Sequence, residues 1–260
     1  MDIIVCIKQV PDTTEVKIDR KTNTLIREGI PNVINPFDKN AVEEALRLRE
    51  KYGGKVIVIS MGPPHAQEAL RETIAMGADE AILLSDKAFA GADTLATSYT
   101  LAMAIKKLGS FDLVICGKQA IDGDTAQVGP ELGEMLDISQ VAYVCKISIE
   151  DGKAIVERVI EDGYELMEVT LPFLMTVTKE INEPRHASLR GVLKAKKKEI
   201  PIWGVKELGI NEDKVGLNGS ATQVIKIFSP PPREGTRMIE GTIEEMIQEL
   251  VGNLKKRKVI

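Results

Sequence analysis

Histidine, cysteine and aromatic residues are scarce in this sequence, and each scarcity excludes a class of protein. The chain has two histidines, three cysteines and one tryptophan among 260 residues. The cysteines are far apart, each lies in an apolar run, and no Cys-x-x-Cys pair is present. We therefore expect reduced thiols, and neither a zinc site nor a dithiol redox centre. Because only 4% of the residues are aromatic, a base-stacking surface for single-stranded nucleic acid is not expected either.

Strong positive charge and long hydrophobic runs are also missing. The formal net charge is −5, which argues against a dedicated nucleic-acid binder. No apolar run approaches the ~20 residues of a membrane span, and the chain starts with a strand-like run at 3–7 rather than with a signal peptide. We expect a cytoplasmic protein without a membrane span. Its 43% hydrophobic content suffices for one large domain, or for one domain with an appendage.

Short apolar runs alternate with amphipathic, helix-length segments through the first half of the chain. This rhythm predicts right-handed parallel crossovers, and so an α/β fold with a doubly wound, mostly parallel, Rossmann-like sheet. A small hairpin is expected between the first strand and the first helix, from 16–19 and 24–27. The expected strands are 3–7, 55–60, 81–84 and 111–116, and the expected helices are those capped by Asp38 and Asp93 and the one that stops at Gly77.

The pattern changes after residue 137. Four short runs, the first three of them linked by two Asp-Gly turns, predict an antiparallel meander from 141–149, 154–160, 164–170 and 173–178. A basic cluster of helical length follows, then a Pro- and Gly-containing stretch from 200 to 232 and an amphipathic helix over 242–256. We predict an α/β domain over 1–199 and an extended C-terminal arm over 200–260, which lacks the apolar density for a core of its own and covers another surface.

Several polar loops are predicted to meet at the carboxyl edge of the sheet, where α/β proteins bind ligands. The loops at 6–10, 61–64 and 117–124 follow strands, and the helix start at 35–38 can be brought beside them. In the 117–130 loop, Asp124 or Thr125 can cap the next helix, whose free N–H groups favour a phosphate. The alternatives are an ordinary polar connection and, for residues 35–37, a helix entry with a hydrophobic staple.

Together, several motifs in order give the sequence a family resemblance. They are VCIKQVP (5–11), NPF (35–37), AMGAD (75–79), GKQAID (117–122), NEPR (182–185) and KAKKK (194–198), with the acidic hairpin EDGYE (161–165) and the segment LPFLMT (171–176). This combination resembles the beta subunit of electron transfer flavoprotein, from the first strand into the C-terminal arm.

The resemblance implies an electron-carrying subunit that pairs with a larger alpha subunit and binds an adenine nucleotide in its own sheet. It also implies a docking segment at 184–195, in which Leu189 contacts a redox partner of the acyl-CoA dehydrogenase or quinone oxidoreductase type. A quinone-reducing partner would place the complex at the membrane periphery. The cofactor-binding residues implied are Cys6, Asn35, Pro36, Phe37, Asp38, Met61, Gly117, Lys118, Gln119, Ala120, Ile121, Asp122, Gly123, Asp124, Thr125, Ala126, Gln127 and Val128.

The loop over 122–130 bears on which nucleotide is bound. Family members that hold AMP have a loop resembling Asp-Asp-Asp-x-Asn-Gln-Thr-Gly, whereas DGDTAQVGP here resembles the loop of members that hold a second FAD. Gly123 and Ala126 remove side-chain bulk and Thr125 offers a hydroxyl, which favours a diphosphate. FAD is therefore expected, with AMP as the alternative. The FAD-type members oxidise NADH and bifurcate its electrons, which implies NADH as donor.

A stand-alone ATP-binding or ATP-sensing protein of the same architecture is the competing hypothesis. The chain has no Walker-type Gly-x-x-x-x-Gly-Lys-Ser/Thr and no Ser/His or metal constellation. We therefore predict no catalytic residues in this chain. Two features also keep simpler interpretations: Leu189 can fill a local surface gap, and the lysine cluster can be a solvated face.

Overall fold

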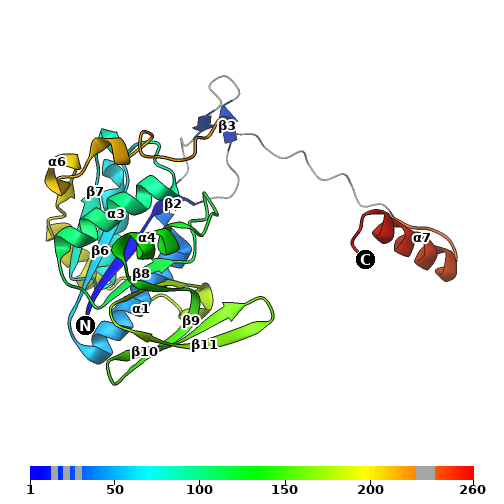
Figure 1. The fold of residues 1–260 in the computed structure, drawn as a ribbon, viewed down its shortest axis with the longest axis horizontal. Helices are drawn as coiled ribbons and strands as arrows, with labels where there is room; N and C mark the ends of the chain where they lie inside the picture. Colours follow the sequence, from blue (N-terminus) through cyan, green and yellow to red (C-terminus); the bar gives the residue numbers. More distant parts are fainter. Residues whose placement is uncertain (13–16, 20–23, 27–30, 227–237) are drawn as a thin grey trace. The chain divides into compact units, whose positions relative to one another are not determined.

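The structure is a computed structural model that describes residues 1–12, 17–19, 24–26, 31–226 and 238–260. It divides into two compact units, Met1–Ile225 and Lys226–Ile260. The first unit holds the sheet and its covering helices, and the second holds one helix (Figure 1). Among the described residues, no helix has both the length and the apolarity to cross a membrane.

A nine-stranded sheet forms the centre of the first unit, in the order β11-β10-β9-β12-β8-β1-β6-β7-β13. Every neighbouring pair from β9 to β13 is parallel, whereas β9, β10 and β11 pair antiparallel. The predicted mixed sheet is therefore confirmed. The strands are β1 (Asp2–Ile7), β6 (Lys55–Met61), β7 (Glu80–Leu84), β8 (Leu113–Gly117), β9 (Ser139–Glu150), β10 (Lys153–Ile160), β11 (Gly163–Thr170), β12 (Phe173–Val177) and β13 (Ile202–Trp203).

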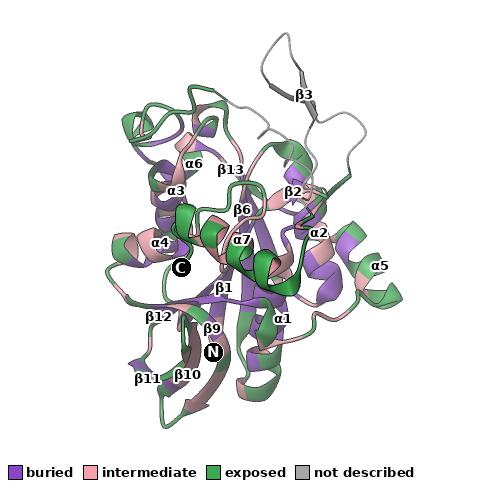
Figure 2. Cartoon of the chain, turned by 90° about the vertical axis from the view of Figure 1, so that its right-hand side faces the viewer, coloured by how far each residue is buried: buried purple, intermediate pink, exposed green. Residues whose placement is uncertain are grey.

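Helices cover both faces of this sheet, because the connections between the parallel strands β1, β6, β7 and β8 each carry a helix back across it (Figure 1). One core cluster joins the sheet to α1, α2 and Ala195 of α5, and the other joins it to α3, Leu132 of α4 and Leu208 of α6. The central strands are buried on both faces (Figure 2), as their continuous apolar sequences require. The helices are α1 (Pro36–Tyr52), α2 (Gln67–Met76), α3 (Thr94–Leu108), α4 (Val128–Leu136), α5 (Leu189–Lys197) and α6 (Val205–Leu208).

Two small antiparallel pairs lie between β1 and α1 in the sequence. The expected hairpin is present as β3 (Lys17–Asp19) and β4 (Thr24–Ile26); Val16, Arg27 and the turn at 20–23 lie outside the described residues. The second pair, β2 (Gln9–Pro11) with β5 (Asn32–Ile34), was not predicted from the sequence. It brings the start of α1 back beside the end of β1, because the chain on either side of this excursion is paired strand to strand.

The strand over Phe173–Val177 differs from its prediction as the last strand of an antiparallel meander. In the structure β12 runs parallel to both neighbours, between β8 and β9. All five of its residues are buried, whereas β11 is mostly exposed. A strand buried on both faces belongs inside a helix-covered parallel sheet, so β12 joins the centre and only β9, β10 and β11 form the meander.

Residues 200–225 also differ from the expected irregular arm that begins at residue 200. Here β13 adds an edge strand beside β7, and Leu208, Ile210 and Val215 are buried in the core cluster with α3. The division between compact units therefore falls after Ile225. These scattered apolar residues bury themselves by covering an existing sheet, which does not require a core of their own.

Helix α7 (Ile243–Lys256) in the second unit has no fully buried residue. Thr242 and Glu245 form a capping box at its start, which agrees with the predicted helix over 242–256. Its apolar residues lie at helical spacing, and Ile243, Ile247 and Leu250 are exposed. Within the described part of the second unit, no other helix or strand is present to cover this apolar stripe.

Candidate functional site

Three neighbouring strands end at the same edge of the sheet, and their loops form the candidate site. Strand β1 lies between β8 and β6, with Cys6 opposite Cys116 on one side and Ile59 on the other. The following residues, Lys8, Gly62 and Lys118, therefore leave the sheet side by side. The expected convergence of the strand-end loops at this edge is thus found in the structure.

The buried carboxylate of Asp38 connects two of these loops to α1. Its oxygens accept hydrogen bonds from the backbone N–H of Lys8 (2.7 Å) and of Gly117 (3.1 Å). Burial is the main cause that raises the pKa of Asp38 to about 7, against the lowering effect of these hydrogen bonds. Asp38 does not cap α1 as expected, because the helix begins at Pro36 with Asn35 at the N-cap. Its two oxygens hold the ends of β1 and β8 in place, and its contact with a nucleotide stays a prediction.

Asn35 has a similar role toward the loop after β8. Its amide nitrogen donates to the Gln119 carbonyl (2.8 Å), and its amide oxygen accepts from the Ile121 N–H (3.1 Å). The side chain is fully buried. The amide therefore fixes the main chain of the loop through one donated and one accepted hydrogen bond, and its contact with adenosine stays a prediction.

Lys8 forms an ion pair with the same loop at the protein surface. Its Nζ donates to both carboxylate oxygens of Asp122, at 2.8 and 2.7 Å. Both side chains are partly exposed, so the ion pair contributes little to stability, but it places a cation beside the loop. Sequence reasoning did not single out Lys8 as a site residue; its position directly after a buried strand was the available signal.

The residues before α4 leave backbone donors unused. The N–H groups of Thr125, Ala126 and Gln127 make no hydrogen bond with another described residue, and Gln127, the N-cap, gives no side-chain cap. Asp124 and Ala126 have positive φ values of 54° and 55°. Alternating left- and right-handed backbone gathers N–H groups into an anion-binding concavity. The expected cap by Asp124 or Thr125 is absent, because α4 begins at Val128, later than either residue.

Glycine at position 117 is required by the close approach of α1. A Cβ atom there would lie 2.2 Å from Asp38 Oδ1 and 2.8 Å from the Phe37 carbonyl carbon. By contrast, a Cβ atom on Gly123 would meet nothing within 4 Å, and Gly123 does not have positive φ. Gly117 is therefore needed for the packing of α1 against β8, whereas the space around Gly123 could hold a side chain.

The thiols of Cys6 and Cys116 lie on adjacent strands beneath the loops. Both are buried and unoxidised. A hydrogen bond with Cys116, followed by burial, raises the pKa of Cys6 well above its usual range. Both residues lie beneath the strand-end loops. No group of three potential metal ligands occurs in the described part of the chain.

A cavity of about 570 Å³ adjoins the carboxyl edge on the side of β12 and β9. It includes two of the implied cofactor residues, Phe37 and Lys118. Lys179 lies 5.0 Å from the centre of the Phe37 ring, and Lys118 lies 5.1 Å from that of Tyr143. Sequence reasoning missed Tyr143 and Lys179, because they reach Lys118 only through the insertion of β12 between β8 and β9.

Leu189 lies apart from this edge, at the start of α5. Ser188 caps the helix by accepting from the Gly191 N–H, and Leu189 is 79% exposed. Val192 and Leu193, on the next turn, are exposed as well. The leucine therefore fills no gap in its own chain, which removes that alternative interpretation.

Sequence comparison places the chain among known proteins. The family described as "Electron transfer flavoprotein domain" matches residues 22–208. The chain is 56% identical, over the full length of both proteins, to an electron transfer flavoprotein subunit beta of Thermoanaerobacterium thermosaccharolyticum. It is 55% identical, again over both full lengths, to subunit CarD of the caffeyl-CoA reductase-Etf complex of Acetobacterium woodii. It is 46% identical to FixA of Sinorhizobium fredii, over 98% of this chain and 92% of that protein. The chain belongs to the electron transfer flavoprotein family, as a beta subunit.

Proposed function

We propose that this beta subunit binds the adenine nucleotide of an electron-transferring complex at the carboxyl edge formed by β8, β1 and β6. The observation that carries the proposal is the run of unused N–H groups from Thr125 to Gln127 at the start of α4. Such groups, together with the positive end of a helix dipole, bind phosphate oxygens. No polar side chain of the described residues competes for them.

In this proposal, different residues of the chain have different roles in binding the nucleotide. Asn35 and Asp38 hold the loops in place through main-chain hydrogen bonds, and the space beside Gly123 admits a ligand. Lys8 offsets negative charge at the loop. Phe37 and Lys118 line the adjoining cavity, where an aromatic ring can stack on a planar group and a cation can pair with a negative charge.

FAD is the proposed nucleotide, with AMP as the alternative. Gly123 and Ala126 leave room for a diphosphate, and the loop sequence resembles that of FAD-type members of the family. Bound FAD would supply hydride and one-electron chemistry to the complex, with NADH as electron donor and electron bifurcation as its overall reaction. The similarity to CarD, whose name places it in a complex with a reductase, is compatible with such a role.

The nucleotides released from the assembled complex test this assignment. The complex of this chain with an electron transfer flavoprotein alpha subunit would be denatured, and the supernatant analysed by chromatography and mass spectrometry. Two FAD per alpha–beta pair are expected, one of them from this chain. One FAD with one AMP would show that the alternative is correct, and FAD alone at one per pair would contradict nucleotide binding by this chain.

The C-terminal unit is proposed to bind the alpha subunit. The stripe of Ile243, Ile247 and Leu250 on α7 is exposed, and an apolar stripe of this kind is stabilised by a partner surface. Ending the chain at Ile225 should leave the first compact unit folded and abolish co-purification with the alpha subunit. Co-purification at the original ratio would contradict this assignment.

Leu189 is proposed to dock the redox partner, an acyl-CoA dehydrogenase or a quinone oxidoreductase-type enzyme. A leucine that is 79% exposed at a helix start can enter a pocket of another protein without rearranging its own chain. Truncating one buried anchor costs about 2 kcal/mol, or roughly thirtyfold in affinity. Leu189→Ala should therefore slow electron transfer at limiting partner concentration while nucleotide content stays unchanged. Equal rates across partner concentrations would refute the docking role.

A further inference from the structure

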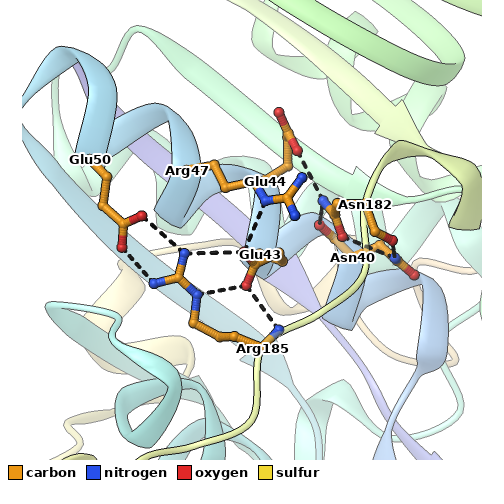
Figure 3. A network of polar contacts seen from close by, with 7 residues as sticks. All are labelled: Asn40, Glu43, Glu44, Arg47, Glu50, Asn182 and Arg185. Carbon is orange, nitrogen blue, oxygen red and sulfur yellow. Dashed lines mark hydrogen bonds and ion pairs between the residues drawn. The ribbon is translucent and has the colours of Figure 1, made fainter.

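The docking segment (184–195) is attached to α1 by an arginine whose hydrogen-bonding groups are almost all in use (Figure 3). The Arg185 guanidinium donates to Glu43 (Nε to Oε2, 2.8 Å; Nη2 to Oε1, 3.1 Å) and to both oxygens of Glu50. The backbone N–H of Arg185 also donates to Glu43, at 3.1 Å. When an arginine donates two hydrogen bonds to one carboxylate, the pair fixes the orientation of the guanidinium as well as its distance from the carboxylate.

Glu43 is the buried partner in this cluster. Its side chain is 4% exposed, against 32% for Arg185 and 48% for Glu50. Burial alone would raise the pKa of Glu43, but the hydrogen bonds from Arg185 and Arg47 and the Arg185 charge lower it on balance. A buried carboxylate that stays ionised needs its cation, so the contact holds residue 185 against α1.

The far end of the docking segment is attached to α2. Arg71 donates to the carbonyl oxygens of Ala195 (2.8 Å) and Lys198 (3.1 Å), at the last turn of α5. Between the two attachments, α5 lies so close to α2 that a Cβ on Gly191 would be 2.1 Å from the Ala75 carbonyl oxygen. Leu189 lies between these anchored points.

We propose that Arg185 is a positioning residue for partner docking: its clamp on Glu43 and Glu50 fixes the direction in which Leu189 is presented. The proposal rests on the docking role of Leu189 proposed above. Arg185 lies four residues before Leu189 and outside α5, so its contacts with Glu43 and Glu50 hold the chain that leads into the Ser188 cap of α5. A segment ordered before binding loses less conformational entropy when the partner arrives.

A double-mutant cycle on the assembled alpha–beta complex tests the proposal. The probe is a purified acyl-CoA dehydrogenase, titrated as electron acceptor. Leu189→Ala should raise KM for the dehydrogenase about thirtyfold, and Arg185→Gln about fivefold, with kcat unchanged. If Arg185 acts through Leu189, the double variant should be no worse than Leu189→Ala alone. A multiplied effect, near 150-fold, would overturn the proposal.

Arg47→Gln is the matched control. Arg47 also donates to Glu43, at 3.0 Å, but among the described residues no hydrogen bond or ion pair joins it to the docking segment. This variant should leave KM unchanged. If Arg47→Gln raises KM as much as Arg185→Gln does, the charge of Glu43 rather than the attachment of residue 185 is responsible, and the proposal fails.

Hydrogen exchange of the same complexes tests the attachment of Arg185 to Glu43 and Glu50 independently of partner docking. Arg185→Gln should speed the amide exchange of residues 186–193 about tenfold, because the attachment that suppresses local opening is lost, whereas Arg47→Gln should not. Unchanged exchange in Arg185→Gln would overturn the proposal. If exchange rises but the unmodified complex shows no saturable transfer to the dehydrogenase, the clamp stands and the proposed docking to this class of enzyme fails.

Discussion

Helix α1 holds the strand-end loops and the 184–195 segment by different chemistry. At its start, buried Asn35 and Asp38 bond to backbone groups of the strand-end loops. Further along, Glu43 and Glu50 bond to the charged side chain of Arg185. One attachment therefore fixes main chain inside the protein, and the other fixes a surface segment by ion pairs.

Because of this difference, the two attachments should respond differently to added volume, to changes of charge and to salt. Main-chain contacts around buried polar groups leave no room for extra atoms, so the start of α1 should be sensitive to volume and to the charge of Asp38. Ion pairs with partly exposed members tolerate small shifts and are screened by salt.

Gly117→Val should have the largest effect. Its Cβ would lie 2.2 Å from Asp38 Oδ1 and 2.8 Å from the Asp38 backbone nitrogen, so either β8 or α1 must move. We expect a loss of more than about 3 kcal/mol in the free energy of unfolding, measured by denaturant titration. A midpoint equal to that of the unmodified chain would show that the start of α1 is not tightly packed.

Asp38→Asn should change the pH dependence of stability. Because the pKa of Asp38 is about 7 in the folded chain, the folded state keeps a proton that the unfolded state loses above its ordinary pKa of 3.8. The unmodified chain therefore loses stability through this group as pH rises from 3.8 to 7.

The asparagine variant has no such titration. Relative to the unmodified chain it should gain stability across that pH window, by at most about 4 kcal/mol. Denaturant titrations of both chains at a series of pH values measure this difference. Parallel stability curves for the two chains would contradict a buried, proton-holding Asp38.

Arg185→Gln should have a moderate effect on stability. Glu43 loses its main cation but keeps Arg47, so we expect the free energy of unfolding to fall by about 2 kcal/mol. The loss should shrink in high salt, which screens the partly exposed pairs, whereas that of Gly117→Val should not. Equal salt dependence in the two variants would remove the contrast between the two attachments to α1.

Gly123→Val should have the smallest effect on stability, within about 0.5 kcal/mol, because its Cβ meets no other atom of the chain. Its nucleotide content should fall nevertheless, since the valine side chain occupies the space proposed for the ligand. Unfolding midpoints and absorbance spectra of the purified complex measure the two quantities. Full nucleotide content would count against a ligand beside Gly123.

The architecture could be predicted from the sequence where its causes are local. The α/β rhythm follows from apolar runs, and Asp93 caps α3 as expected, by accepting from the Ala96 N–H. The parallel pairing of Phe173–Val177 was not predicted, because it depends on strands that lie far away in the sequence. Residues 200–225 were mistaken for an arm, since their few apolar residues bury themselves only against a sheet formed elsewhere.

The candidate site could likewise be predicted only where its causes are local. The strand-end loops could be placed at one edge because parallel strands end together. The roles of Asn35 and Asp38 could not be predicted, since their partners lie about 80 residues away, at Gly117, Gln119 and Ile121. Likewise, NEPR (182–185) was recognised as a family motif, but nothing in its sequence identifies Glu43 as the partner of Arg185.

A crystal structure of the alpha–beta complex would show directly whether this chain binds the nucleotide. Nucleotide density is expected at the edge of β8, β1 and β6, with phosphate oxygens about 3 Å from the backbone nitrogens of Thr125 to Gln127. The Asn35 and Asp38 side chains should keep their hydrogen bonds to the loops. Density for the nucleotide elsewhere in this chain, or a loop at 117–128 without any ligand in a complex that retains its nucleotides, would contradict nucleotide binding at this edge.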